Sequence, residues 1–164
     1  MSGKIFLAGG GNEKQSYLID EIFLENVNSI LYIPWAWPDD NFENCKKWFS
    51  NMLSKHKLVK TDTLTEINGN VDLTKFDAVY IGGGNTFKLL KRLKETELDR
   101  KLLDFYNSEK KIYGGSAGAL IFGVDIGTAL LCKDKDVNLV KLKDISGFNL
   151  VKNHNIQCHF ESNQ

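Results

Sequence analysis

Four short apolar runs recur along the chain, and each is followed by glycine or proline and then by a segment with helical spacing. The runs are Ile5–Ala8, Ile30–Ile33, Ala78–Ile81 and Ile112–Tyr113. Runs of this length that stay apolar at every position are typical of strands covered by helices on both faces. The repeated order of strand, turn and helix therefore predicts an α/β fold, with a mostly parallel sheet flanked by helices.

Between these runs, apolar residues recur three and four positions apart, which gives a helix one apolar stripe to pack on a sheet. The spacing predicts helices over Tyr17–Phe23 and Phe42–Leu53, and a third that runs on from Phe87 to Tyr106. Beyond Leu120 the pattern changes to charged turns, and we expect short strands at Val137–Val140 and Ile156–Phe160. Because open parallel sheets bind ligands at the carboxyl ends of their strands, the turns there are the places to look for function.

Length and composition limit the partners. The chain has 164 residues, which fits one domain, and its 21 Lys and Arg balance 21 Asp and Glu. A neutral chain lacks the basic face that nucleic acid or an anionic membrane requires, so we expect a small ligand instead. No apolar stretch is long enough for a signal peptide or a membrane span, and three cysteines without C-x-x-C spacing fit a reducing compartment. We therefore expect a cytoplasmic protein.

The strongest motif for chemistry is G-x-S-x-G, formed by Gly114, Ser116 and Gly118 directly after a predicted strand. This pattern is typical of a nucleophile elbow, in which a sharp turn holds up a serine hydroxyl. The backbone N–H of Ala117 could then donate to a developing oxyanion. The alternative is a glycine-rich connection in which Ser116 only caps the following helix.

A second glycine turn, Gly82-Gly83-Gly84-Asn85, also ends a strand and opens a helix, with Asn85 or Thr86 as the predicted N-cap. The N–H of Gly84 is the candidate for a second oxyanion donor. Neither this turn nor the one at Gly9 has the spacing of a nucleotide-binding motif.

A serine nucleophile needs a base, and the chain has three histidines. His56 stands in a charged stretch and is expected to be solvated. His159 is the preferred base and His154 the reserve, because both follow the serine in the chain order of elbow hydrolases. Asp134 and Asp136 are candidates for the acid that orients the imidazole, although such an alternating charged run is usually a solvated turn. None of the three cysteines lies on a strand-to-helix turn, so they are interpreted as core residues.

The segments IGGGNTFKLLKRL, YGGSAGALIFG and ILYIPWAWP together resemble the peptidase E group of serine peptidases, relatives of cyanophycinase. The resemblance implies a glutamine-amidotransferase-like, flavodoxin-like three-layer sandwich. It implies Ser116 as nucleophile, His159 as base, and an oxyanion hole at Gly84 and Ala117. It further implies a dipeptidase that releases amino-terminal aspartate from Asp-X dipeptides without a metal or cofactor. Separately, we expect a monomer or a homodimer.

The chain departs from that family at its end, because family members continue well past the histidine. If the acid that orients the imidazole lies between Ser116 and His159, Asp134 is the first choice and Asp136 is nearly as good. Otherwise the acid lies beyond position 164. The alternatives to a dipeptidase are an inactive or truncated member that acts as a binding domain, and a cyanophycinase-like peptidase. Trp35 and Trp37, in the turn after the second strand, either wall a pocket or belong to the core.

Overall fold

The computed structural model describes residues 2–10, 13–56, 59–131 and 135–159. Its strands are β1 Lys4–Ala8, β2 Ser29–Ile33, β3 Lys60–Thr63, β4 Ala78–Ile81 and β5 Lys111–Gly115. The helices are α1 Glu13–Leu24, α2 Phe42–Leu53, α3 Thr86–Glu95, α4 Leu98–Asn107 and α5 Ala117–Leu120, with 3-10 turns η1 Leu73–Lys75 and η2 Gly127–Leu130.

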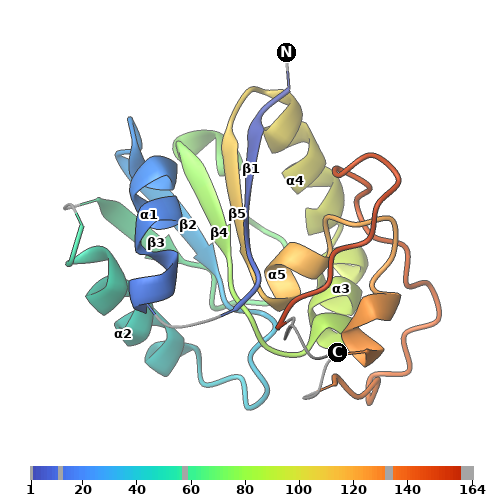
Figure 1. Cartoon of the computed structure of the whole chain (residues 1–164). Coiled ribbons are helices and arrows are strands. Elements are labelled where there is room, and N and C mark those ends of the chain that lie inside the picture. The colour runs from blue at the N-terminus through green and yellow to red at the C-terminus, as the bar shows by residue number, and fades with distance from the viewer. Residues whose placement is uncertain (1, 11–12, 57–58, 132–134, 160–164) are drawn as a thin grey trace.

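The five strands form one parallel sheet in the order β1-β5-β4-β2-β3. Helices α1 and α2 cover one face, and α3, α4 and α5 cover the other (Figure 1). Side chains of β2 alternate between the two faces: Ile30 and Tyr32 pack with α1 and α2, whereas Leu31 and Ile33 pack with α3 and α4. The predicted α/β fold with a parallel, helix-flanked sheet is confirmed as a three-layer sandwich.

Two element predictions for the first half of the chain were incomplete. The helix expected to run from Phe87 to Tyr106 is two helices, because Glu97 adopts a left-handed backbone with φ 56° between them. Strand β3 was missed because its sequence, Lys-Thr-Asp-Thr, has no apolar run. It lies at the sheet edge beside β2, where charged and polar side chains can face water.

The last part of the chain also differs from the prediction. Residues 137–140 form no strand, and only 139 and 140 belong to a turn. Residues 156–159 also form no strand, and Phe160 lies outside the described residues. Backbone hydrogen bonds instead tie this irregular segment to the residues after α5, for example Phe148 N–H to the Ile121 carbonyl at 2.7 Å. Phe148 and Leu150 pack onto the core on the α3 face. The segment ends at the carboxyl edge of the sheet (Figure 1).

Candidate active site

Ser116 stands at the junction of β5 and α5 with φ 50° and ψ −111°, a backbone conformation that residues with a side chain rarely adopt. Such a conformation costs of order 1–3 kcal/mol and persists only where the surroundings enforce it. The Ser116 N–H donates to the Ala8 carbonyl at 2.8 Å, and the Ser116 carbonyl accepts from the Ala119 N–H at 2.8 Å. Both sides of the residue are therefore fixed, and the hydroxyl lies above the end of the sheet.

The two flanking glycines allow α5 to pack directly against the strands. A Cβ at Gly118 would lie 2.3 Å from the Ile81 carbonyl oxygen, and one at Gly114 would lie 2.2 Å from the Gly118 carbonyl oxygen. Both distances are shorter than any side chain tolerates. The G-x-S-x-G spacing therefore has a packing reason as well as a possible chemical one.

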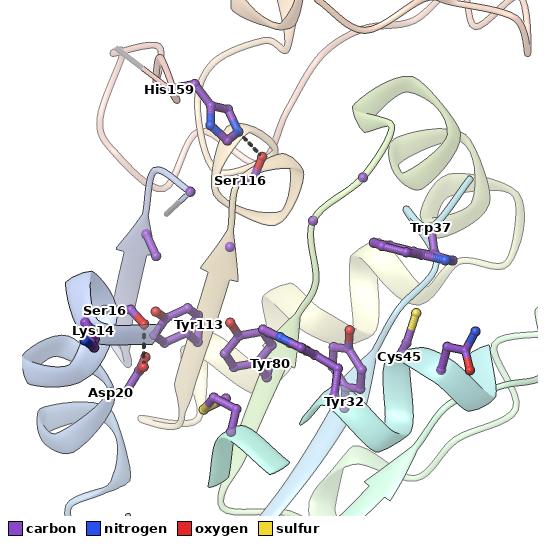
Figure 2. Close-up of a pocket in the computed structure, with 18 residues that line it drawn as sticks. Lys14, Ser16, Asp20, Tyr32, Trp37, Cys45, Tyr80, Tyr113, Ser116 and His159 are labelled. Carbon is purple, nitrogen blue, oxygen red and sulfur yellow. Dashed lines mark hydrogen bonds between the residues drawn. The ribbon is translucent and has the colours of Figure 1, made fainter. Parts of the chain in front are cut away.

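The end of the described chain brings His159 to Ser116. The His159 Nε2 lies 2.9 Å from the Ser116 Oγ (Figure 2). The backbone N–H of His159 donates to the Gly9 carbonyl at 2.9 Å. Gly10, with φ +95°, lies under the ring, since a Cβ there would be 2.2 Å from the His159 Cε1. The first glycine turn thus makes room for the imidazole, a role that its sequence did not reveal.

The other two histidines lie elsewhere. His154 is exposed, and its Nδ1 donates to the Lys152 carbonyl at 2.9 Å. The expectation that His56 is solvated was wrong: its side chain is 3% exposed, pairs with Glu21 and stacks on Tyr17 at 4.6 Å between ring centres. The cause is the packing of the end of α2 against α1, which local sequence does not encode.

Of the two aspartates predicted as the acid of the site, the structure describes only one. Asp134 lies outside the described residues. The Asp136 carboxylate accepts a hydrogen bond from the Thr86 N–H at 2.7 Å, at the start of α3, and borders a cavity of about 230 Å³ together with Ser116 and His159. Among the described residues, no carboxylate is hydrogen-bonded to the His159 ring.

The turn between β4 and α3 runs beside the serine. Gly84 has φ +136° and borders the same two cavities as Ser116. Its neighbour Gly83 comes closer than the sequence suggested, because a Cβ on Gly83 would lie 3.2 Å from the Ser116 Cβ. Asn85 is the N-cap of α3, and its side chain accepts from the Lys88 N–H at 2.9 Å. Ala117 is the first residue of α5, directly after the serine.

A larger cavity of about 990 Å³ opens beside the serine, between the sheet and helices α1 and α2. Its floor is a row of three tyrosines at matching positions of neighbouring strands, Tyr32, Tyr80 and Tyr113. Gly82 and Gly115, two positions after Tyr80 and Tyr113, make room for the tyrosine hydroxyls: a Cβ on Gly82 would lie 2.9 Å from the Tyr32 Oη, and one on Gly115 would lie 3.4 Å from the Tyr80 Oη. Burial raises the pKa of all three phenols, so they are neutral hydrogen-bonding groups at neutral pH.

Of the two tryptophans after β2, one belongs to the core and the other borders a cavity. Trp35 is fully buried and donates from Nε1 to the Leu64 carbonyl at 2.9 Å, so it belongs to the core. Trp37 is 40% exposed and borders the large cavity. Arg92 fixes their loop with two hydrogen bonds of 2.8 Å to the Asp40 carboxylate. These hydrogen bonds from Arg92, with help from Lys88, lower the pKa of Asp40 to about 2.

Two of the cysteines are confirmed as buried residues. Cys158 donates from Sγ to the Ser116 carbonyl at 3.5 Å, and Cys45 lies at the wall of the large cavity, where burial raises the pKa of its thiol. Cys132 lies outside the described residues. In the described part of the chain, no three metal-binding side chains gather closely enough to hold an ion. That part also has no helix with the length and apolar character needed to cross a membrane.

A serine and a histidine within hydrogen-bond distance, on a strained turn at the carboxyl edge of a parallel sheet, are the arrangement of serine hydrolases on α/β folds. The family model of peptidase family S51 matches residues 5–164. The chain therefore belongs to peptidase family S51, a family of hydrolases, and the resemblance to peptidase E is confirmed.

Individual relatives agree with this assignment. An uncharacterized peptidase of Listeria monocytogenes serovar 1/2a is 37% identical over 93 residues, which cover 57% of this chain and 44% of that one. Peptidase E of Actinobacillus pleuropneumoniae serotype 5b is 25% identical over 169 residues, 99% of this chain and 70% of that one. The match thus spans less than half the length of the Listeria peptidase.

A solved structure supports the fold. The crystal structure of a Listeria monocytogenes EGD-e protein described as peptidase E superposes with a TM-score of 0.73 at 25% identity. That superposition covers 93% of this chain and 77% of the other.

Proposed function

We propose that Ser116 and His159 are the nucleophile and the base of a serine peptidase. The observation that carries the proposal is the 2.9 Å contact between the Ser116 Oγ and the His159 Nε2. In this mechanism the imidazole accepts the hydroxyl proton while Oγ bonds to the substrate carbonyl carbon. The imidazolium then protonates the leaving amine as the C–N bond breaks. Water, deprotonated by the same imidazole, releases the acyl group and restores the serine.

The backbone N–H groups of Gly84 and Ala117 are the proposed donors to the oxyanion. Ala117 follows Ser116 directly at the start of α5, and Gly84, in the β4–α3 turn, lines the same two cavities as Ser116. Their position supports this role, because donors fixed before the reaction need no rearrangement as charge develops on the carbonyl oxygen.

Asp136 is the proposed acid of the site. Its carboxylate borders the same small cavity as His159, and a negative charge near the ring favours the imidazolium that forms during catalysis. The hydrogen bond from the Thr86 N–H holds this carboxylate at the edge of that cavity. Asp136→Asn should therefore lower kcat more than it changes KM.

The proposed substrate is a short peptide with an amino-terminal aspartate. The name peptidase E, borne by several relatives, supports this class, and a cavity of about 990 Å³ has room for a dipeptide. An aspartate side chain needs a cation, and Lys14 is the one lysine or arginine among the described residues that line this cavity. Lys14 is thus the candidate for recognising the substrate carboxylate.

Hydrolysis of Asp-X dipeptides by the parent, Ser116→Ala and His159→Ala tests the proposal. Each variant should lose at least about a thousandfold in kcat/KM, because loss of a nucleophile or its base removes most of the rate enhancement. Ser50→Ala, which changes an exposed serine on α2, is the matched control and should keep full activity. A Ser116→Ala variant as active as the parent would contradict the mechanism.

A further inference from the structure

Two cations of α3 hold the loop that joins β2 to α2. Lys88 and Arg92 stand four residues apart on one side of the helix, and each side chain is 16% exposed. Arg92 donates to both carboxylate oxygens of Asp40 at 2.8 Å, and Lys88 pairs with the same carboxylate at 2.8 Å. The other acceptors are loop carbonyls: Trp35 for Arg92 at 2.8 Å, and Trp37 and Pro38 for Lys88 at 3.0 and 2.7 Å. We call Lys88, Arg92 and Asp40 the α3 clamp.

The α3 clamp fixes the main chain of the loop and not only one side chain. Its two cations face one carboxylate, and the remaining positive charge is met by the three loop carbonyl oxygens. Hydrogen bonds from charged donors are roughly twice as strong as neutral ones. The paired hydrogen bonds from the Arg92 guanidinium to Asp40 also fix orientation, because the planar guanidinium matches the plane of the carboxylate. Residues 35–40 are therefore held at several points against α3.

The same loop supports the turn that carries the proposed oxyanion donor Gly84. The Ala36 carbonyl accepts the Asn85 N–H at 2.8 Å. A Cβ on Gly84 would lie 2.2 Å from the Ala36 oxygen, so this glycine packs directly against the loop. Ala36 stands between Trp35 and Trp37, the residues whose carbonyls the clamp holds. The position of the Gly84 N–H therefore depends on a loop that the α3 clamp fixes.

We propose that Arg92 and Lys88 are positioning residues, which hold the Gly84 N–H where the oxyanion forms by clamping residues 35–40. The inference rests on the proposed function, which assigns Gly84 as an oxyanion donor. Such a donor accelerates the reaction only when it is fixed before charge develops, and a small displacement weakens its bond to the transition state more than it weakens substrate binding. Loosening the clamp should therefore lower kcat more than it raises KM. A residue that only stabilised the fold would change neither constant in folded protein.

Steady-state hydrolysis of Asp-Leu by Arg92→Met is the first test, because this change removes the guanidinium and keeps the apolar stem. Complete loss of one oxyanion donor costs about 100- to 1,000-fold in kcat, so a displaced donor should cost less, roughly 10-fold. Arg92→Lys, which keeps a cation, should recover part of that loss. Arg100→Met is the matched control: it changes an exposed arginine of α4 that pairs with Glu97, and kcat should equal that of the parent. A rise in KM with unchanged kcat in Arg92→Met would overturn the proposal.

Amide hydrogen exchange, followed by mass spectrometry, tests the clamp without turnover. Arg92→Met should speed exchange in the turn 82–86, where the Asn85 N–H bonds to Ala36, by roughly 3- to 10-fold, and Arg100→Met should not. Should Arg92→Met fail to fold by circular dichroism, Asp40→Asn replaces it: a loss of roughly 3-fold in kcat supports the proposal, and no loss overturns it. Unchanged exchange at this turn in Arg92→Met would also overturn the proposal. Faster exchange in that variant, beside a parent chain that hydrolyses no Asp-X dipeptide, would contradict only the proposed function.

Discussion

Replacing Ser116 with glycine should give a more stable protein than replacing it with alanine, although both variants lose the proposed nucleophile. Both changes remove the hydrogen bond from Oγ to His159, so the comparison isolates the Cβ atom. At φ 50° and ψ −111° that Cβ is strained by about 1–3 kcal/mol, a strain that glycine does not have. Glycine loses about 0.5–1 kcal/mol more backbone entropy on folding. The net expectation is that Ser116→Gly is about 0.5–2 kcal/mol more stable than Ser116→Ala.

Urea unfolding followed by circular dichroism measures this difference. The two variants should share one slope of unfolding free energy against urea and differ in midpoint, which assigns the difference to stability. A gain of 1 kcal/mol should raise the melting temperature by about 2–4 °C for a chain of this size. If Ser116→Ala were as stable as Ser116→Gly or more so, the turn would not be strained, and the argument that the fold stores strain at the serine would be refuted.

The remaining predictions concern the support of the site. Gly118→Ala should destabilise the protein by about 1–3 kcal/mol or more by chemical denaturation, since its Cβ would lie 2.3 Å from a β4 carbonyl oxygen. Gly9→Ala, whose Cβ would have its nearest neighbour at 3.9 Å, is the control and should cost less than about 0.5 kcal/mol. Because the pKa of Asp40 is lowered to about 2, its ion pairs should contribute fully to the free energy of unfolding above about pH 4. This contribution should be lost as the pH falls towards 2. That contribution is about 1 kcal/mol or less, since Asp40 is 43% exposed, and Asp40→Asn should flatten the pH dependence of unfolding accordingly; an unchanged profile would refute it. Trp35→Phe should lose about 1–3 kcal/mol by leaving a carbonyl unpaired, whereas Trp37→Phe should change KM and leave the melting temperature nearly unaltered; the opposite pattern would contradict their assignment.

The sequence was sufficient to predict the parts of the fold that carry strong apolar patterns. The strand at Ala78–Ile81 is buried at every position, and its continuous apolar run reflects helices on both faces. Edge strand β3 has no such run because one side of it faces solvent. The break at Glu97 was hidden because apolar spacing continues on both sides of it, while Thr96 bonds back from Oγ1 to the Arg92 carbonyl at 2.7 Å.

The candidate site was predictable in part. Ser116 lies in a motif whose glycines have a local steric purpose, and His159 was chosen from its order in the chain. By contrast, no local pattern indicates that Gly10 lies under the imidazole or that Asp20 borders the cavity. Those relations arise when segments far apart in the chain meet at the edge of one sheet. The irregular segment that ends at His159 was wrongly predicted to contain strands. Its apolar residues pack on the core although the backbone there forms a loop.

Covalent labelling with diisopropyl fluorophosphate, followed by peptide mapping in a mass spectrometer, tests the central claim most directly. The reagent reacts much faster with a serine hydroxyl that a neighbouring base activates than with an ordinary hydroxyl. The account predicts one adduct, on Ser116, that forms in the parent chain together with loss of peptide hydrolysis and is absent from His159→Ala. A parent chain that hydrolyses peptides but carries its adduct on another residue, or a His159→Ala variant labelled at Ser116 as fast as the parent, would contradict it.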